Sequence, residues 1–213
     1  MTTRILAVDT TCEYGSVALI ENDRVMEEVA IHAPDGFGQA LFGYLENWRL
    51  TLKDIDCFAC AQGPGTFTGV RIGLAAMKGL AFALSKPVCA ISNLEAIAFL
   101  GSEPLRAAFL DARRDEIYGA VYDAQSNLIS GEVVTSLPRW MASLDGKDVE
   151  YLTTELTLCS VGPMSTKAVG TSLAGAVGLL ASRKYAQGQA QHARAIDANY
   201  VRRADAEMSW EDK

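Results

Sequence analysis

Residues 62–74 read Gln62-Gly63-Pro64-Gly65-Thr66-Phe67-Thr68-Gly69-Val70-Arg71-Ile72-Gly73-Leu74, and this stretch predicts a tight loop that leads from a strand into a helix. Three glycines within seven residues permit backbone turns that other residues disfavour. Thr66 and Thr68 are placed to cap the helix, whose first N–H groups suit an anion. The segment is not a Walker A loop, because no Gly-Lys-Ser/Thr follows, and its glycine spacing differs from GxGxxG. Two interpretations follow: a plain strand-to-helix connection, or a contact with a phosphate or a partner.

The helix predicted over residues 69–84 has two faces that avoid charge. One is an apolar stripe at helical spacing, and the other consists of small residues that permit close approach of another backbone. Arg71 and Lys78 are its only charged residues. The small residues either pack on the protein's own sheet or receive a partner helix, and the sequence leaves both open. The stripe is Val70, Leu74, Met77, Ala81 and Leu84, and the small face is Gly69, Gly73, Ala76 and Ala83.

The elements on either side of this loop predict an α/β fold with two halves. Each half opens with a strand, an acidic polar turn, a strand, a turn and a third strand before a helix. The turn-rich segment 101–104 predicts the boundary, so we expect lobes at residues 1–104 and 105–213. The predicted strands are 5–8, 16–20, 25–31, 55–61, 88–91, 107–110, 117–122, 128–135 and 149–153; the predicted helices are 37–50, 69–84, 94–100, 137–144 and 166–183.

The composition of the chain limits its function. Its 213 residues include 19 Lys+Arg and 26 Asp+Glu, for a net charge of −7, and 49% are hydrophobic. That apolar content excludes an intrinsically disordered chain. The acidic balance is spread along the chain and argues against tight nucleic-acid binding by the chain alone, because phosphate contacts need clustered Lys and Arg.

Cysteine usage and hydropathy predict a soluble, cytoplasmic protein. The five cysteines are an odd number scattered through apolar runs, which favours reduced thiols over a disulfide framework. The N-terminus lacks a signal-peptide pattern because Asp9 interrupts the apolar run, and we expect no membrane contact. Cys57 and Cys60 form a CxxC inside an apolar strand, where we expect structural burial rather than redox chemistry.

Two acidic residues, Asp9 and Asp111, each follow the strand that opens one half. Acids at equivalent strand ends, facing a common cleft, are what a metal–phosphate site needs. Asp is also common in turns, and spacing alone favours that interpretation. The two histidines, His32 and His192, are too far apart in the chain to form an HExxH-type pair. We therefore predict no catalytic residue and no metal site.

The loop at 62–74 resembles the strongest motif of the TsaB (YeaZ) family, whose members are subunits of the bacterial system that makes threonylcarbamoyladenosine in tRNA. The resemblance covers nearly the whole chain, strongly to about residue 122 and more thinly over 125–198. It implies a two-lobed α/β fold like that of actin, Hsp70 and sugar kinases (ASKHA), with mixed sheets flanked by helices. The other matching segments are Ile5-Leu6-Ala7-Val8-Asp9-Thr10-Thr11, Lys78-Gly79-Leu80-Ala81, Ser92-Asn93-Leu94-Glu95-Ala96, Asp111-Ala112-Arg113-Arg114-Asp115-Glu116-Ile117-Tyr118 and Tyr200-Val201-Arg202.

The resemblance also implies a role and partners. TsaB-like proteins pair with a TsaD-like catalytic subunit, which transfers threonylcarbamoyl to N6 of adenosine 37 in tRNAs that read ANN codons, and a TsaE-like ATPase joins them. The chain is thus expected to be a non-catalytic scaffold, a homodimer when alone, that reaches tRNA only through the complex. ATP or ADP with Mg is expected in the complex, with Asp9, Thr10 and Asp111 as candidate cofactor-binding residues. The expected partner interface, on first-lobe helices, is Leu41, Leu45, Gly69, Arg71, Gly73, Ala76, Met77 and Leu80.

Missing motifs agree with a scaffold role. The chain has no His-x-x-x-His pair and no Gly-Gly-Val-Ala-Ala-Asn-type nucleotide motif, both of which TsaD-like proteins carry. Residues 37–43 also depart from the His-Ser/Thr-x-x-Leu-Leu-Pro of many relatives, and Phe37 replaces the usual His, which predicts a more apolar partner surface. Two alternatives stay open. One is a small ATPase or kinase that uses Asp9 and Asp111, and the other is a tRNA-binding module that uses the pairs Arg113/Arg114 and Arg202/Arg203.

Overall fold

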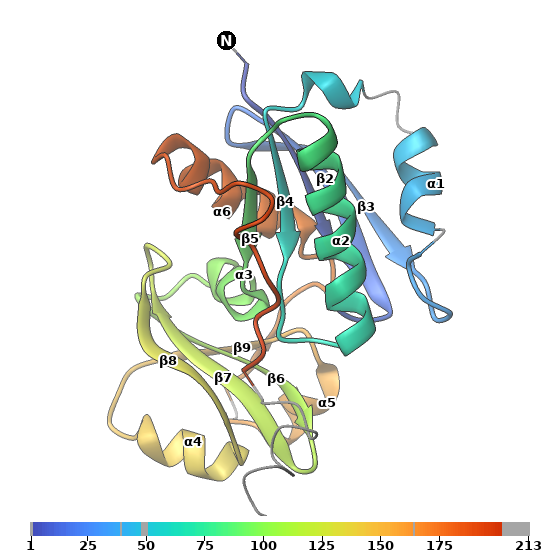
Figure 1. The fold of residues 1–213 in the computed structure, drawn as a ribbon. Coiled ribbons are helices and arrows are strands. Elements are labelled where there is room, and N and C mark those ends of the chain that lie inside the picture. The colour runs from blue at the N-terminus through green and yellow to red at the C-terminus, as the bar shows by residue number, and fades with distance from the viewer. Residues whose placement is uncertain (1, 39, 48–50, 164, 202–213) are drawn as a thin grey trace, which may run out of the picture. The chain divides into compact units, whose positions relative to one another are not determined.

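A computed structural model describes residues 2–38, 40–47, 51–163 and 165–201 of the chain. Within these residues the chain forms two compact units, which are coloured by residue number in Figure 1. Of the described residues, the first unit holds those between 2 and 96 together with 170–198, and the second holds those between 97 and 169 together with 199–201. Each unit is built on one mixed five-stranded sheet.

The first sheet runs in the order β3-β2-β1-β4-β5. An antiparallel meander joins β1, β2 and β3, whereas β1, β4 and β5 are parallel. The central strand β1 is buried from its second residue to its last, because helices cover both faces of the sheet. The strands are β1 (Arg4–Asp9), β2 (Tyr14–Glu21), β3 (Arg24–His32), β4 (Cys57–Ala61) and β5 (Val88–Ile91).

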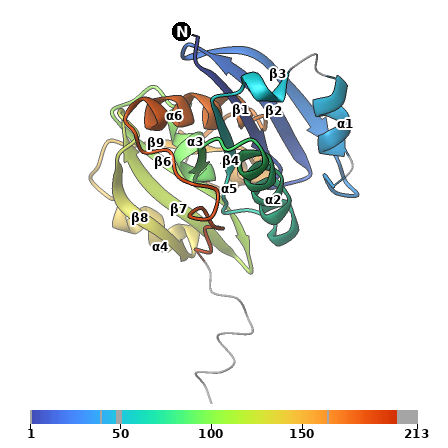
Figure 2. The same cartoon turned by 45° about the horizontal axis from the view of Figure 1, so that its top comes forward.

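Alternating side chains of the first sheet face different helices. Val8 faces α2 (Phe67–Ala83), where it lies beside Gly73. Ala7 and its neighbour Ile20 face α6 (Ala174–Ala186), where a Cβ at Gly178 would collide with the Ile20 side chain. Side chains alternate along a strand, so α2 and α6 cover opposite faces, as both views of the fold show (Figures 1 and 2).

Helix α1 shares the α2 face of the first sheet. It spans Ala40–Asn47, and its Leu41 and Leu45 are buried in the same cluster as Val8. Two shorter helical elements complete this part of the chain: the 3-10 turn η1 (Leu52–Asp54), and α3 (Asn93–Phe99), which follows β5 and spans the junction between the two units.

The second sheet runs in the order β10-β9-β6-β7-β8. Its core combines aliphatic side chains with an aromatic group, in which Phe109 of β6 and Tyr151 of β9 pack against Trp140 of α4. The edge strand β8 exposes Leu128 and Ile129. The elements are β6 (Leu105–Arg113), β7 (Glu116–Asp123), β8 (Leu128–Thr135), α4 (Leu137–Ser143), β9 (Glu150–Thr153), α5 (Leu156–Val161) and β10 (Lys167–Ala168).

The predicted α/β class and all nine predicted strands are confirmed, but two helix predictions need correction and one helix was missed. The helix predicted over 37–50 is α1 at Ala40–Asn47, and residues 48–50 lie outside the described residues. The helix predicted over 166–183 is wrong at its start, because β10 pairs there with β9 and the helix begins only at Ala174. Helix α5 was not predicted. It is short and has no buried residue, and its first and last residues, Leu156 and Val161, are exposed, so its sequence shows no apolar periodicity.

The contacts divide the chain differently from the predicted lobes 1–104 and 105–213. Residues 170–198 return to the first unit, because the apolar helix α6 packs on the first sheet. The first unit is therefore discontinuous in sequence, which a division at a single turn-rich boundary does not capture. Among the described helices, none combines the length and the apolar character that a bilayer crossing requires.

Candidate functional site

The loop 62–69, the end of β1 and the start of α3 meet in a junction that Asn93 organises. The Asn93 Oδ1 atom accepts a hydrogen bond from the Gly63 N–H at 3.0 Å, and its Nδ2 donates to Thr11 Oγ1 at 2.7 Å. The Thr66 N–H donates to the Thr11 carbonyl at 2.7 Å. We call Asp9, Thr10, Thr11, Gly63, Thr66, Gly69 and Asn93 the Asn93 junction. Hydrogen bonds between the side chains and backbone groups of these residues fix the loop against the strand end.

Glycines are needed in the loop because Thr10 and Thr11 lie against it. A Cβ at Gly69 would lie 2.0 Å from the Thr10 carbonyl oxygen, and one at Gly65 would lie 2.6 Å from the Thr11 carbonyl oxygen. Gly63 adopts a φ of +102°, which favours glycine, and a cis peptide bond follows it. The spacing of the glycines thus reflects close packing on the chain's own strand end.

Helix α2 begins two residues earlier than predicted, and Thr66 caps it. Thr66 Oγ1 accepts from the Gly69 N–H at 3.2 Å, whereas Thr68 lies inside the first turn. Thr10 Oγ1 donates to the Gly69 carbonyl at 2.7 Å. Of the two interpretations of the loop, the plain strand-to-helix connection accounts for these contacts.

Asp9 is buried within this junction. Its Oδ1 accepts from the Thr11 N–H at 2.9 Å and from Thr11 Oγ1 at 2.7 Å. Its Oδ2 is buried and has no partner among the described residues. Burial raises the pKa of Asp9, and the hydrogen bonds from Thr11 oppose that shift only in part.

Asp111 lies inside β6 rather than at its end, because the strand continues to Arg113. Its Oδ1 accepts from the Arg113 N–H at 2.7 Å, and its Oδ2 lies 3.3 Å from Arg113 Nη1. Its own N–H donates to Glu155, a carboxyl whose pKa is raised by burial. Asp111 therefore stabilises the turn that follows it, and Asp9 and Asp111 belong to different units, each held by its own local contacts.

Most of the predicted partner-interface residues are buried in the first unit. Gly69 and Gly73 of α2 face the junction: a Cβ at Gly73 would lie 2.6 Å from Thr10 Oγ1. Phe37, expected on the same surface, is only 2% exposed and packs beside Gly15. The buried interface candidates are Leu41, Leu45, Gly69, Gly73, Ala76 and Met77, and only Arg71 and Leu80 reach solvent.

The exposed side of these helices carries aromatic residues. Phe67 and Phe82, near opposite ends of α2, are 56% and 59% exposed, and Phe42 of α1 is 47% exposed. The Arg71 guanidinium lies 3.6 Å from the centroid of the Phe67 ring. Sequence reasoning missed Phe67 and Phe82 as surface residues, although their i, i+15 spacing with Arg71 between them places all three on one helix face.

Three of the five cysteines, Cys57, Cys60 and Cys89, are buried in the first sheet. Cys57 and Cys60 are both buried, as predicted, and burial raises the pKa of Cys60 to about 12. A hydrogen bond from the Cys57 thiol to the Cys89 sulfur, 3.9 Å away, raises the pKa of Cys57 and lowers that of Cys89. This cross-strand thiol pair was not predicted. Among the described residues, no three His, Cys, Asp or Glu side chains are grouped in a way that would hold a metal ion.

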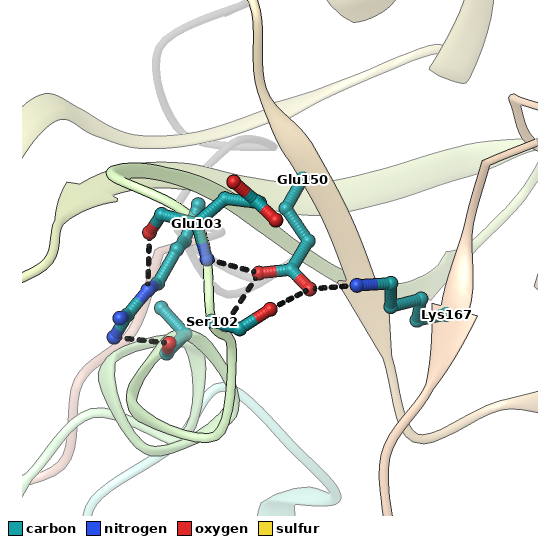
Figure 3. Close-up of polar contacts among 6 residues, drawn as sticks. Ser102, Glu103, Glu150 and Lys167 are labelled. Carbon is teal, nitrogen blue, oxygen red and sulfur yellow. Dashed lines mark hydrogen bonds and ion pairs between the residues drawn. The ribbon is translucent and has the colours of Figure 1, made fainter.

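A second polar cluster was also missed, and it centres on Glu150 in the second unit (Figure 3). Its Oε2 accepts from the Ser102 and Glu103 N–H groups at 2.7 and 3.0 Å. Its Oε1 accepts from Ser102 Oγ at 3.2 Å and from Lys167 Nζ at 2.5 Å. Burial opposes the charge, but these hydrogen bonds outweigh it and lower the pKa of Glu150 to about 2. The cluster ties the segment before β6 to β9 and β10.

Comparison with known proteins gives a family and close structural relatives. The family model described as "TsaD: tRNA N6-adenosine threonylcarbamoyltransferase" matches residues 37–210. The chain is 28% identical to the tRNA threonylcarbamoyladenosine biosynthesis protein TsaB of Bacillus subtilis, over 97% of each chain. It is 38% identical to TsaB of Haemophilus influenzae over 54% of this chain and 51% of that protein. The structure of YeaZ from Pseudomonas aeruginosa superposes with a TM-score of 0.80 at 29% identity, covering 93% of this chain and 99% of that one.

Proposed function

Because the chain belongs to the TsaD family and, within it, to the TsaB (YeaZ) type with the actin, Hsp70 and sugar-kinase (ASKHA) fold, we propose that it is a non-catalytic subunit of a tRNA-modifying assembly. The names of its relatives support a role in the biosynthesis of threonylcarbamoyladenosine in tRNA. The finer proposal is that the chain supports a TsaD-like subunit, which places threonylcarbamoyl on N6 of adenosine 37 in tRNAs that read ANN codons.

One observation supports the non-catalytic part of the proposal: apart from Asp9 Oδ2, the polar side chains of the Asn93 junction form hydrogen bonds within the junction. Thr10 Oγ1 is committed to the Gly69 carbonyl, and Asp9 Oδ1 is committed to Thr11. A residue that binds and turns over a substrate needs polar atoms that the substrate can reach. Asp9 and Thr10, two of the three residues expected to hold a cofactor, are only 1% and 2% exposed.

We assign the partner surface to the exposed side of α1 and α2. Phe42, Phe67 and Phe82 are large apolar side chains that are about half exposed, and Arg71 lies on Phe67. Aromatic and Arg side chains are enriched at the centres of protein interfaces. We propose that a TsaD-like subunit binds here, that the chain forms a homodimer through this face when alone, and that a TsaE-like ATPase joins the heterodimer, so that tRNA contact depends on the assembly.

Binding tests this surface with a matched pair of variants. Phe67→Asp should weaken association with the TsaD-like subunit by about 2 kcal/mol, or roughly thirtyfold, as expected for loss of an interface aromatic residue. Leu156→Asp is the control, because Leu156 is 74% exposed but lies in the second unit. Affinities are measured by sedimentation velocity. Equal effects of the two variants would contradict the proposed surface.

A second candidate function, a small ATPase or kinase, has one observation in its favour. The buried Asp9 Oδ2 has no partner among the described residues, which leaves one oxygen for a ligand. The other predicted cofactor residues do not fit a magnesium–nucleotide site in this chain, because Thr10 bonds to Gly69 and Asp111 is engaged with Arg113. We therefore assign any ATP or ADP binding to the assembly. Calorimetry with Mg–ATP tests this: micromolar binding to the lone chain that Asp9→Asn abolishes would favour the enzyme.

A further inference from the structure

Two long stretches of this acidic chain contain no carboxylate side chain. The chain has 26 Asp+Glu and a net charge of −7, yet residues 57–94 and 156–196 contain neither Asp nor Glu. The first stretch includes the whole of α2, and the second includes α6 and the segment that follows it. Any surface that these two stretches build together is therefore free of negative side chains.

The two stretches meet at the C-terminal end of α2. Lys78 Nζ donates to the Ile196 carbonyl at 2.7 Å, which holds the segment after α6 beside α2, as Figures 1 and 2 also show. The Phe82 ring packs edge-on against His192 with centroids 6.5 Å apart. The Arg194 guanidinium lies 5.7 Å from the Phe82 centroid. We call Phe82, His192 and Arg194 the Phe82 cluster.

The Phe82 cluster is exposed and its cation is unpaired within the part of the chain that the structure describes. Phe82 is 59% exposed, and both His192 and Arg194 lie at the surface. Arg194 has no ion pair with any described carboxylate. Its guanidinium is oriented by the aromatic ring rather than by an acid, so its N–H groups remain available to an incoming acceptor.

We propose that the Phe82 cluster, together with the exposed face of α2, docks an acidic surface of a partner protein, whose carboxylates bind Arg194 and whose apolar side chains cover Phe82. This inference rests on the proposed function, and it adds the chemistry of the partner's face. Arg194 can bind a carboxylate with two parallel hydrogen bonds, and Phe82 supplies the apolar contact. An RNA partner is disfavoured, since a protein of net charge −7 with so few surface cations here neutralises few phosphates.

The same charge pattern predicts which of the two proposed complexes, the homodimer or the heterodimer with a TsaD-like subunit, has the higher affinity. If two copies associated through α2, each would present a surface that carries Arg71 and Arg194 and no acidic side chain. Because both surfaces are then positively charged, their repulsion opposes association. A homodimer through this face is thus the weaker complex and should tighten as salt screens the repulsion. A heterodimer with an acidic face should instead weaken with salt.

The test measures binding of the full chain to the TsaD-like subunit of the same organism at 50 and 300 mM NaCl. Arg194→Glu should weaken binding about tenfold at 50 mM, and Phe82→Ala about as much. Arg24→Glu, the same charge reversal at an exposed position of β3, is the control and should change affinity less than twofold. Circular dichroism melts confirm that each variant is folded.

The possible outcomes distinguish a failure of this inference from a failure of the proposed function. If the unaltered chain does not bind the TsaD-like subunit at either salt concentration, the proposed function fails. If it binds, but Arg194→Glu matches Arg24→Glu or binding is unaffected by salt, the acidic-face inference is overturned while the function stands. If Arg194→Glu leaves protein binding intact but lowers the affinity of the assembled complex for tRNA, the cluster is an RNA contact and the inference is also overturned.

Discussion

Replacing Glu150 by Gln tests how the second unit is held together. The side chain of Glu150 is 3% exposed and accepts four hydrogen bonds, one of them from Lys167. Its pKa falls from 4.5 to about 2 on folding, and one pKa unit corresponds to about 1.4 kcal/mol. Because Lys167 is 56% exposed and screened by water, we expect the charged form to contribute about 2–3 kcal/mol.

The sign of the pH dependence follows from the lowered pKa. The stabilisation is fully present above the unfolded pKa near 4.5 and is lost as the pH falls toward about 2. Glu150→Gln should therefore lower the free energy of unfolding by about 2–3 kcal/mol at pH 7, and the difference should shrink between pH 4.5 and 2.

Urea unfolding measures this difference at pH 7, 4 and 2.5, followed by circular dichroism and by tryptophan fluorescence, since Trp140 lies in the core of the second unit. Glu103→Gln is the control, because Glu103 is exposed and belongs to the same segment. A Glu150→Gln variant that is as stable as the control at pH 7 would refute the reasoning, and so would a difference that does not change with pH.

Three further predictions concern the first unit. Gly69→Ala should destabilise the chain by about 2–3 kcal/mol because its Cβ would collide with the Thr10 carbonyl, whereas Gly79→Ala, which meets nothing within 4 Å, should stabilise it by about 0.5–1 kcal/mol; thermal melts compare the two. Asn93→Ala should cost about 2–3 kcal/mol in urea unfolding because it leaves the Gly63 N–H without its acceptor, and an unchanged midpoint would contradict that role. A thiol reagent should label the exposed Cys12 rapidly in the native protein but the buried Cys57, Cys60 and Cys89 only after unfolding; fast labelling of the buried set would contradict their structural role.

Local patterns predicted the strands well because each is a short apolar run bounded by turns. The strands at 88–91 and 128–135 match their predicted bounds. The failures occur where distant residues decide the structure. The segment at Lys167–Ala168 is extended because it pairs with β9, and no local feature of its sequence reports that neighbour.

The candidate site could be predicted only in part, because residues distant in the sequence also decide its structure. The glycines of the loop and the Asp residues were recognised, but sequence alone could not decide what lies against them. For Gly69 and Gly73 the neighbour is Thr10, more than fifty residues earlier in the chain, so these two members of the small-residue face are internal, whereas Ala83 is exposed. No local sequence pattern indicates the Glu150 cluster, because the residues that bind the Glu150 carboxylate, such as Ser102 and Lys167, are 48 and 17 residues away in the chain.

Reconstitution of the tRNA modification tests the central claim most directly. The reaction combines tRNA, the TsaD-like and TsaE-like subunits, ATP and a threonylcarbamoyl-adenylate source, with and without this chain, and counts threonylcarbamoyladenosine at position 37. A non-catalytic subunit predicts no product from this chain alone, product from the complete mixture, and a large loss when the chain is omitted. Full modification without the chain, or transfer by the chain without the TsaD-like subunit, would contradict the account.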